Sequence, residues 1–201
     1  RGMFTFVIWD KNKQELFGAR DHFGIKPFYY AKMNGTFMYA SEIKSLLRHP
    51  DFVKELNAEA LKPYMTFQYP AIGETFFKGV YKLPEGHYFT YRDGKMDIHR
   101  YYDEDFREGK QKLGELVNSI DQTVCDSVKA HQIADVEVGS FLSSGVDSSY
   151  VAAVARPQHT YSIGFGKGTY NESQQAGELA ELLKLNNTAE SLTDEEAFAA
   201  F

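Results

Sequence analysis

The residues best suited to chemistry lie in one short segment, Val-Gly-Ser-Phe-Leu-Ser-Ser-Gly-Val-Asp-Ser-Ser at positions 138–149. An apolar, strand-like stretch ends there in small hydroxyl residues and a glycine, and the apolar run at 150–155 predicts a helix. The free N–H groups of a first helical turn and the positive end of the helix dipole both attract an anion. The segment therefore predicts a phosphate site.

Individual side chains in this segment refine the prediction. Ser143, Ser144, Ser148 and Ser149 add hydroxyl donors. Asp147 alone would repel phosphate, so a carboxylate here indicates a Mg²⁺ ion that bridges to the phosphates. The segment is not a P-loop, because the Gly-Lys-Ser/Thr ending of that motif is absent. The simpler alternative is that serine and glycine only cap the helix, with Asp147 as a first-turn charge.

The elements that must position this segment differ between the two halves of the chain. Residues 1–105 are mainly β in pattern, and Asn34-Gly35 and Asp93-Gly94 are strong two-residue hairpin signals. Asn57 is a suitable N-cap for a short helix. Strands are expected at 3–9, 15–19, 28–32, 36–40, 88–91 and 96–101, and helices at 41–47 and 58–64. This half is predicted to be α+β.

The second half, residues 113–201, alternates between helix and strand, after a charged linker at 106–112. Apolar residues at helical spacing predict an amphipathic helix over 113–131. The expected order continues with strand 137–142, helix 150–155, strand 160–165, helix 171–185, strand 188–192 and a last helix capped by Thr193 or Asp194. Such alternation indicates an α/β doubly wound parallel sheet. Ligands bind beyond the carboxyl ends of such strands, where residues 143–149 fall.

Composition excludes several classes of protein. The 201 residues are 43% hydrophobic, enough for one or two cores. The net charge of −6 and the dispersed Lys and Arg do not suggest a nucleic-acid partner. The single cysteine, Cys125, excludes a disulfide framework and fits a cytoplasmic setting. No stretch reaches the length of a membrane span, so no membrane partner is expected. The opening Arg1 and the helical pattern at Phe201 suggest a piece of a longer protein.

The serine-rich segment resembles the pyrophosphate-binding Ser-Gly-Gly-x-Asp-Ser signature of the N-type ATP pyrophosphatases. Together with further strings, it resembles the synthetase domain of glutamine-hydrolysing asparagine synthetases, and the first half resembles the later part of their glutaminase domain. The second-half strings are 136–153, Tyr-Ser-Ile-Gly-Phe at 161–165 and Tyr-Asn-Glu-Ser at 170–173. The first-half strings are Arg-Gly-Met-Phe at 1–4, residues 19–30, Ala-Ser-Glu-Ile-Lys at 40–44 and Leu-Pro-Glu-Gly-His at 83–87.

The resemblance implies a fold and an activity. Residues 1–105 would be part of an Ntn-hydrolase-type β sandwich, a type 2 glutamine amidotransferase domain. Residues 113–201 would open an adenine-nucleotide α-hydrolase-like domain. In such enzymes an N-terminal Cys releases ammonia from glutamine, Mg-ATP converts aspartate to an aspartyl-adenylate and pyrophosphate, and ammonia displaces AMP to give asparagine. The implied partners are aspartate, glutamine, ATP and Mg²⁺, and the resemblance allows a homodimer of the parent.

The resemblance also assigns site residues, position by position. Asp147 would bind Mg²⁺, and Ile163 and Gly164 would contact adenine. Phe141 and Leu142 would lie by the adenosine, although core strand residues are an equal alternative for these two. The phosphates would be held at Ser143, Ser144, Gly145, Val146, Ser148 and Ser149. Relatives usually carry Gly where this chain has Ser144, and often His near residues 185–188, where this chain has Asn.

No catalytic residue is expected within the chain itself. The family's catalytic Cys would lie upstream of Arg1, and Cys125 is expected to pack within a helix. Two alternatives stay open. The parent could be a sister amidotransferase-linked adenylating enzyme, such as a β-lactam-forming synthetase, because the residues that choose the acceptor would lie downstream. The chain could instead be a catalytically silent nucleotide-binding fragment.

Overall fold

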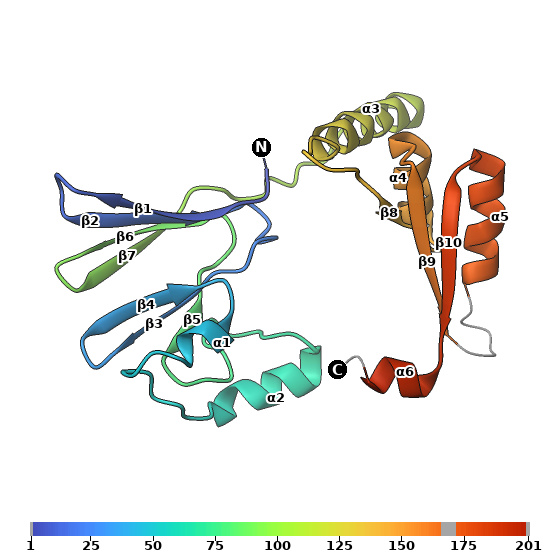
Figure 1. Ribbon diagram of the computed structural model, residues 1–201. Coiled ribbons are helices and arrows are strands. Elements are labelled where there is room, and N and C mark those ends of the chain that lie inside the picture. The colour runs from blue at the N-terminus through green and yellow to red at the C-terminus, as the bar shows by residue number, and fades with distance from the viewer. Residues whose placement is uncertain (1, 166–171, 200–201) are drawn as a thin grey trace. The chain divides into compact units, whose positions relative to one another are not determined.

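A computed structural model describes residues 2–165 and 172–199. Three parts lie outside the described residues: Arg1, residues 166–171 and residues 200–201. They include the first residue of the string at 1–4, the first two residues of the string at 170–173, and the expected start of a helix at 171. Internal contacts divide the chain into two compact units, Arg1–Arg107 and Glu108–Phe201. The ribbon in Figure 1 shows the elements of each unit, which are described separately below.

The first unit contains two antiparallel sheets (Figure 1). The first sheet has the order β1-β2-β6-β7, and the second has the order β4-β3-β5. The strands are β1 (Thr5–Asp10), β2 (Glu15–Arg20), β3 (Tyr29–Met33), β4 (Thr36–Ala40), β5 (Val80–Lys82), β6 (His87–Arg92) and β7 (Lys95–Arg100). Asn34-Gly35 and Asp93-Gly94 have positive φ at both residues, as the tight turn of a two-residue hairpin requires. Both predicted hairpins are therefore confirmed.

The core of the first unit lies between the two sheets. Phe28, Leu83 and Phe89 are almost completely buried, and half-buried side chains from both sheets pack around them. A second cluster under β3 and β4 includes Ala31 and Val80. These large apolar and aromatic side chains supply the buried area that holds two small sheets together.

Two short helices complete the first unit, α1 (Ile43–Leu46) and α2 (Ala58–Phe67). Asn57 caps α2 as expected, since its side chain accepts a hydrogen bond from the Glu59 N–H at 3.2 Å. The helix was expected to end at residue 64, but it continues to Phe67 with Pro63 inside it. It ends where Gln68 takes a left-handed conformation and its N–H bonds to the Tyr64 carbonyl.

The second unit contains one parallel sheet of the order β10-β9-β8, and helices connect its successive strands along the chain (Figure 1). Its elements are α3 (Leu113–His131), β8 (Ser140–Phe141), α4 (Val146–Ala155), β9 (His159–Phe165), α5 (Ser173–Leu183), β10 (Asn186–Leu192) and α6 (Asp194–Ala199). Leu142 from the end of β8 packs in one buried cluster with Ala152 of α4 and with Ala176 and Ala180 of α5. Since α4 and α5 share this cluster with a sheet residue, they pack on the same face of the sheet.

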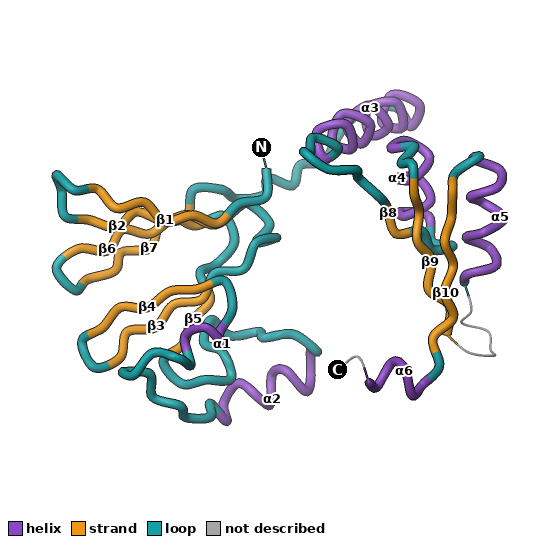
Figure 2. The backbone as a smooth tube through the Cα atoms, viewed as in Figure 1, coloured by secondary structure: helices purple, strands orange, loops and turns teal. Residues whose placement is uncertain are grey.

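Several expected boundaries in this unit are wrong. The strand expected at 137–142 is reduced to two residues, a short orange segment in Figure 2, because pairing with β9 covers only Ser140 and Phe141. The helix expected at 150 begins at Val146, because Gly145 takes the extended backbone of an N-cap. Helix α5 is shorter than the expected 171–185, and β10 begins two residues before the expected 188.

The strand order bears on the expected fold class. In the parallel sheet, the three described strands lie side by side in the same order as in the chain. Right-handed crossovers that continue in one direction place the connecting helices on one face of the sheet. The described strands thus contain no reversal of the kind that a doubly wound sheet has, and the described chain as a whole is α+β with several sheets. None of the described helices is long and apolar enough to cross a membrane.

Candidate functional site

The candidate site begins where β8 ends. The Leu142 N–H donates to the Tyr161 carbonyl of β9 at 2.8 Å, after which the chain leaves the sheet. Ser143 and Ser144 form the turn, Gly145 is the N-cap, and α4 starts at Val146. Asp147, Ser148 and Ser149, expected in the loop, therefore lie in the first turn of the helix. The structure brings the whole predicted segment together as one strand–turn–helix corner.

Hydrogen bonds within the corner hold its shape. The hydroxyls of Ser143 and Ser148 lie 2.7 Å apart, and the Ser143 N–H donates to the Ser148 Oγ at 3.2 Å. The Gly145 N–H donates to the Ser143 Oγ at 3.2 Å, and the Ser149 hydroxyl donates to the Gly145 carbonyl at 2.7 Å. These serines thus shape the turn itself, which agrees with the local structural role that the sequence allowed as an alternative to phosphate binding.

Backbone N–H groups remain to meet a ligand at the start of α4. The first turn of a helix has no intrahelical acceptor for these groups, and Gly145 has no side chain to cap them. Val146 is 83% exposed, and Ser144 and Asp147 are exposed as well. An open helix N-terminus carries a partial positive charge. The arrangement suits an anionic group that approaches from solvent.

Asp147 places one carboxylate at this helix N-terminus. Among the described residues, no group of three or more His, Cys, Asp or Glu side chains is arranged to hold a metal ion. A single exposed carboxylate still fits Mg²⁺, because this ion is often held by one or two carboxylates, several waters and the oxygens of a substrate's phosphates. The residues present would therefore hold Mg²⁺ together with a phosphate ligand and not as a separate protein site.

The residues expected near the nucleoside lie on opposite faces of the sheet. Phe141 is 77% exposed and pairs with Tyr161 in register, so it shares a face with Tyr161 and with Ile163, which is 46% exposed. Leu142 is only 2% exposed and belongs to the core under α4 and α5. Gly164 is buried. Phe141 and Ile163 thus offer accessible apolar side chains, whereas only the backbone of Leu142 and Gly164 could serve a ligand.

Helix α3 is tied to α4 near the corner. The Tyr150 hydroxyl donates a hydrogen bond to Asp121, and this bond to the carboxylate raises the pKa of Tyr150 to about 12. Cys125 lies on α3 as a free, half-buried thiol. This position agrees with the expected packing role.

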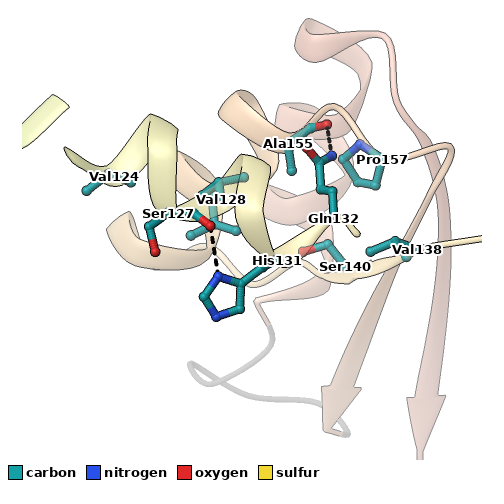
Figure 3. Close-up of a pocket in the computed structure, with 11 residues that line it drawn as sticks. Val124, Ser127, Val128, His131, Gln132, Val138, Ser140, Ala155 and Pro157 are labelled. Atoms are coloured by element: carbon teal, nitrogen blue, oxygen red, sulfur yellow. Dashed lines mark hydrogen bonds between the residues drawn. The ribbon is translucent and has the colours of Figure 1, made fainter. Parts of the chain in front are cut away.

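A separate apolar pocket of about 400 Å³ lies between α3, α4 and the segment that contains β8. Figure 3 shows valine side chains around it, with Gln132 donating to the Ala155 carbonyl and the His131 ring within 2.8 Å of the Ser127 carbonyl. None of the residues 143–149 lines this pocket. The candidate phosphate site is therefore an open corner and not this pocket.

Sequence reasoning missed a buried polar cluster that is hydrogen-bonded to Leu142, the residue before the corner. Thr160 and Ser162 of β9 are 0% and 2% exposed, and both hydroxyls lie within hydrogen-bond distance of the Asn187 Oδ1 of β10. The available signal was the alternation of β9, which places Thr160, Ser162 and Gly164 on the face opposite Tyr161 and Ile163. Small polar residues on the covered face of a strand require partners.

Comparison with known proteins assigns both halves of the chain to recognised families. Residues 1–102 match the family model "Glutamine amidotransferase domain", and residues 119–201 match "Asparagine synthase". The first unit thus matches a glutamine amidotransferase family, and the second unit, which contains the corner, matches an asparagine synthase family. The chain belongs to the family of glutamine-hydrolysing asparagine synthetases.

Individual relatives agree with this assignment. The chain is 40% identical over 201 residues to "Asparagine synthetase [glutamine-hydrolyzing] 1" of Bacillus subtilis, covering 98% of this chain and 32% of the relative. It is 32% identical to "Asparagine synthetase [glutamine-hydrolyzing] 3" of the same organism, covering 82% of this chain and 28% of the relative. The chain thus spans about a third of these relatives.

A similar solved structure is described as the allosteric regulatory enzyme of purine biosynthesis. It is 9% identical and covers 89% of this chain and 44% of its own, with a TM-score of 0.28. This score is too low for a comparison of folds.

Proposed function

We propose that the chain is part of a glutamine-dependent asparagine synthetase, in which Mg-ATP adenylates aspartate and ammonia from glutamine displaces AMP. The observation that carries the proposal is the open N-terminus of α4 behind the serine turn, inside the region that matches the asparagine synthase family. Residues 1–105 would belong to a type 2 glutaminase domain of Ntn-hydrolase type. Residues 113–201 would begin an N-type ATP pyrophosphatase domain, joined through a linker at 106–112.

The phosphates of ATP would bind at the start of α4. The N–H groups of Val146, Asp147 and Ser148 lie in the first turn of α4 and have no intrahelical acceptor, whereas the Gly145 N–H donates to the Ser143 Oγ. The hydroxyls of Ser143, Ser148 and Ser149 set the direction of the turn. Ser144 adds a Cβ and a hydroxyl where the Ser-Gly-Gly-x-Asp-Ser signature that the segment resembles has Gly, and its exposed side chain leaves room for a ligand. These donors would stabilise the negative charge that develops on pyrophosphate as it leaves.

Asp147 would hold Mg²⁺ against the same phosphates. When bound, this ion supplies positive charge that offsets the repulsion between the carboxylate and the phosphates. Phe141 and Ile163 would offer apolar contact to the adenosine on the exposed face of the sheet, with backbone atoms of Leu142 and Gly164 beside them.

Calorimetric titration of Mg-ATP into the chain tests the phosphate site. We expect binding by the unchanged chain and at least about a tenfold loss of affinity in Asp147→Ala, because Mg²⁺ then has no protein carboxylate. Asp194→Ala is the matched control, since Asp194 is also exposed in the first turn of a helix, α6. Equal binding by Asp147→Ala and the unchanged chain would contradict the proposed metal position.

A further inference from the structure

We infer that Ser162 is a positioning residue for the phosphate site: its buried hydroxyl orients the peptide that opens the serine turn. This inference rests on the proposed function. The Ser162 side chain is 2% exposed, and its hydroxyl donates to the Leu142 carbonyl at 2.8 Å. Leu142 directly precedes the turn. The bond therefore joins the middle of β9 to the last residue before the candidate site.

The Leu142 carbonyl controls more than its own position. It belongs to the same planar peptide as the Ser143 N–H, so a hydrogen bond that fixes the carbonyl also fixes the direction of that N–H. The Ser143 N–H donates to the Ser148 Oγ in the first turn of α4. A chain of contacts thus runs from Ser162 through one peptide plane to the helix N-terminus.

The sheet provides little other support at this point. The ladder between β8 and β9 consists of two residue pairs, Ser140 with Thr160 and Phe141 with Tyr161, followed by the Leu142 N–H to Tyr161. A short ladder leaves the following peptide free to rotate unless a side chain holds it. Ser162 supplies that side chain from the covered face of the sheet.

Thr160 and Asn187 complete the cluster but do not contact the turn. Each hydroxyl has a single proton, so the shorter of its two contacts receives it. For Thr160 this is the Asn187 Oδ1 at 2.9 Å, against 3.2 Å to the Asn186 carbonyl. For Ser162 it is Leu142 at 2.8 Å, against 3.2 Å to Asn187. Thr160 therefore joins β9 to β10, and Ser162 joins β9 to the turn.

This division provides a matched pair of variants. Ser162→Ala and Thr160→Val each remove one buried hydroxyl of β9 that lies within hydrogen-bond distance of the Asn187 Oδ1. Only Ser162→Ala also removes a bond to Leu142. A purely structural role predicts similar effects of both. Positioning predicts that Ser162→Ala alone changes the turn and the ligand affinity.

Two measurements on the full chain test the inference. Amide exchange followed by NMR without nucleotide should show the Ser143 N–H at least about fivefold faster in Ser162→Ala and within about twofold in Thr160→Val. Mg-ATP titration should show affinity about tenfold weaker in Ser162→Ala and nearly unchanged in Thr160→Val. Melting temperatures of both variants provide the control for global stability.

The outcomes separate the inference from the proposed function. Equal effects of the two variants, or no effect of Ser162→Ala on Ser143 exchange, would overturn the positioning role. A different outcome is that the unchanged chain does not bind Mg-ATP while Ser162→Ala still speeds exchange of the Ser143 N–H. The missing binding would overturn the phosphate site, and the faster exchange would support the role of Ser162 in the turn.

Discussion

Two adjacent residues, Arg20 and Asp21, organise the loop that follows β2. Both are almost completely buried. The Arg20 guanidinium donates to the carbonyls of Leu83, Gly24 and Lys26, and the Asp21 carboxylate accepts from the N–H groups of Phe4, Ile25 and Lys26. Side chains here replace the partners that a sheet would give the backbone. Asp21 and Gly24 thus lie in one turn, in which the Gly24 N–H donates to the Asp21 carbonyl at 3.1 Å.

Gly24 should tolerate a side chain poorly. Its φ is +63°, and an added Cβ would lie 2.8 Å from the Arg20 guanidinium. We expect Gly24→Ala to lower the free energy of unfolding by about 3 kcal/mol, measured by urea denaturation. The control is Gly35→Ala, where φ is +84° but no atom lies within 4 Å of the added Cβ. That change should cost about 1 kcal/mol, and equal costs would show that the Arg20 contact has no effect.

Asp21 should make the stability of the fold depend on pH. Burial alone would raise the pKa of its carboxyl, but backbone N–H donors outweigh burial and hold that pKa below its ordinary value of 3.8. The ionised form therefore stabilises the fold above about pH 4, and this contribution disappears as pH falls through the lowered pKa.

Asp21→Asn should accordingly destabilise the chain most at pH 5 to 7, with a difference from the unchanged chain that narrows below pH 4. Urea denaturation between pH 7 and pH 2.5 measures this difference. Asp97→Asn, at an exposed position on β7, is the control. A difference that stays constant over the whole range would show that the Asp21 carboxylate is not preferentially stabilised in the folded state.

Helix α2 depends on a buried cap. Asn57 is 2% exposed, accepts from the Glu59 N–H, and donates through its Nδ2 to the Thr75 carbonyl at 3.1 Å. We expect Asn57→Ala to lower the free energy of unfolding by about 2 kcal/mol, because a cap and a buried donor are both lost. Asn57→Asp keeps the acceptor for Glu59 and loses the donor to Thr75. If the two variants unfold at the same urea concentration, the capping bond does not contribute.

Sequence patterns predicted the elements whose cause is local. Asn34-Gly35 and Asp93-Gly94 place their hairpins because positive φ is a property of the turn residues themselves. The helix expected at 113–131 has the same bounds as α3, since its apolar spacing extends over many turns. The predicted length of the strand at 137–142 was wrong, because that length depends on pairing with β9, about twenty residues later in the chain.

The candidate site was predictable to a similar degree. Serines, glycine and aspartate identified the corner, because helix N-terminus chemistry lies within one short segment. The bond from Ser162 to Leu142 joins residues 20 positions apart. Such a contact depends on strand register, which no local pattern specifies.

Taken together, the two units carry the two matched families in the order glutamine amidotransferase, then asparagine synthase. Cys125, the sole cysteine of the sequence, lies in the second unit on α3. Its position separates it in sequence from the amidotransferase region.

In a full-length parent, Cys125→Ser should leave glutamine-dependent asparagine formation within about twofold of the unchanged enzyme, because a half-buried thiol acts as a small packing group. Asparagine is measured with glutamine and, in parallel, with ammonia as the nitrogen source. A loss confined to the glutamine reaction would give the thiol a part in glutamine hydrolysis.

The pairing order of the strands also determines when each sheet can form during synthesis. In the second unit each strand pairs with the next one in the chain, from β8 to β9 to β10, so the sheet can grow as the chain leaves the ribosome. In the first unit β2 pairs with β6, joining Leu16 to Tyr91. The edge of β2 in the β1–β2 hairpin must therefore stay unpaired until residues 87–92 have been made. We expect this delay to make the first unit fold more slowly than the second, with the unpaired strand edge open to aggregation while the chain is being made.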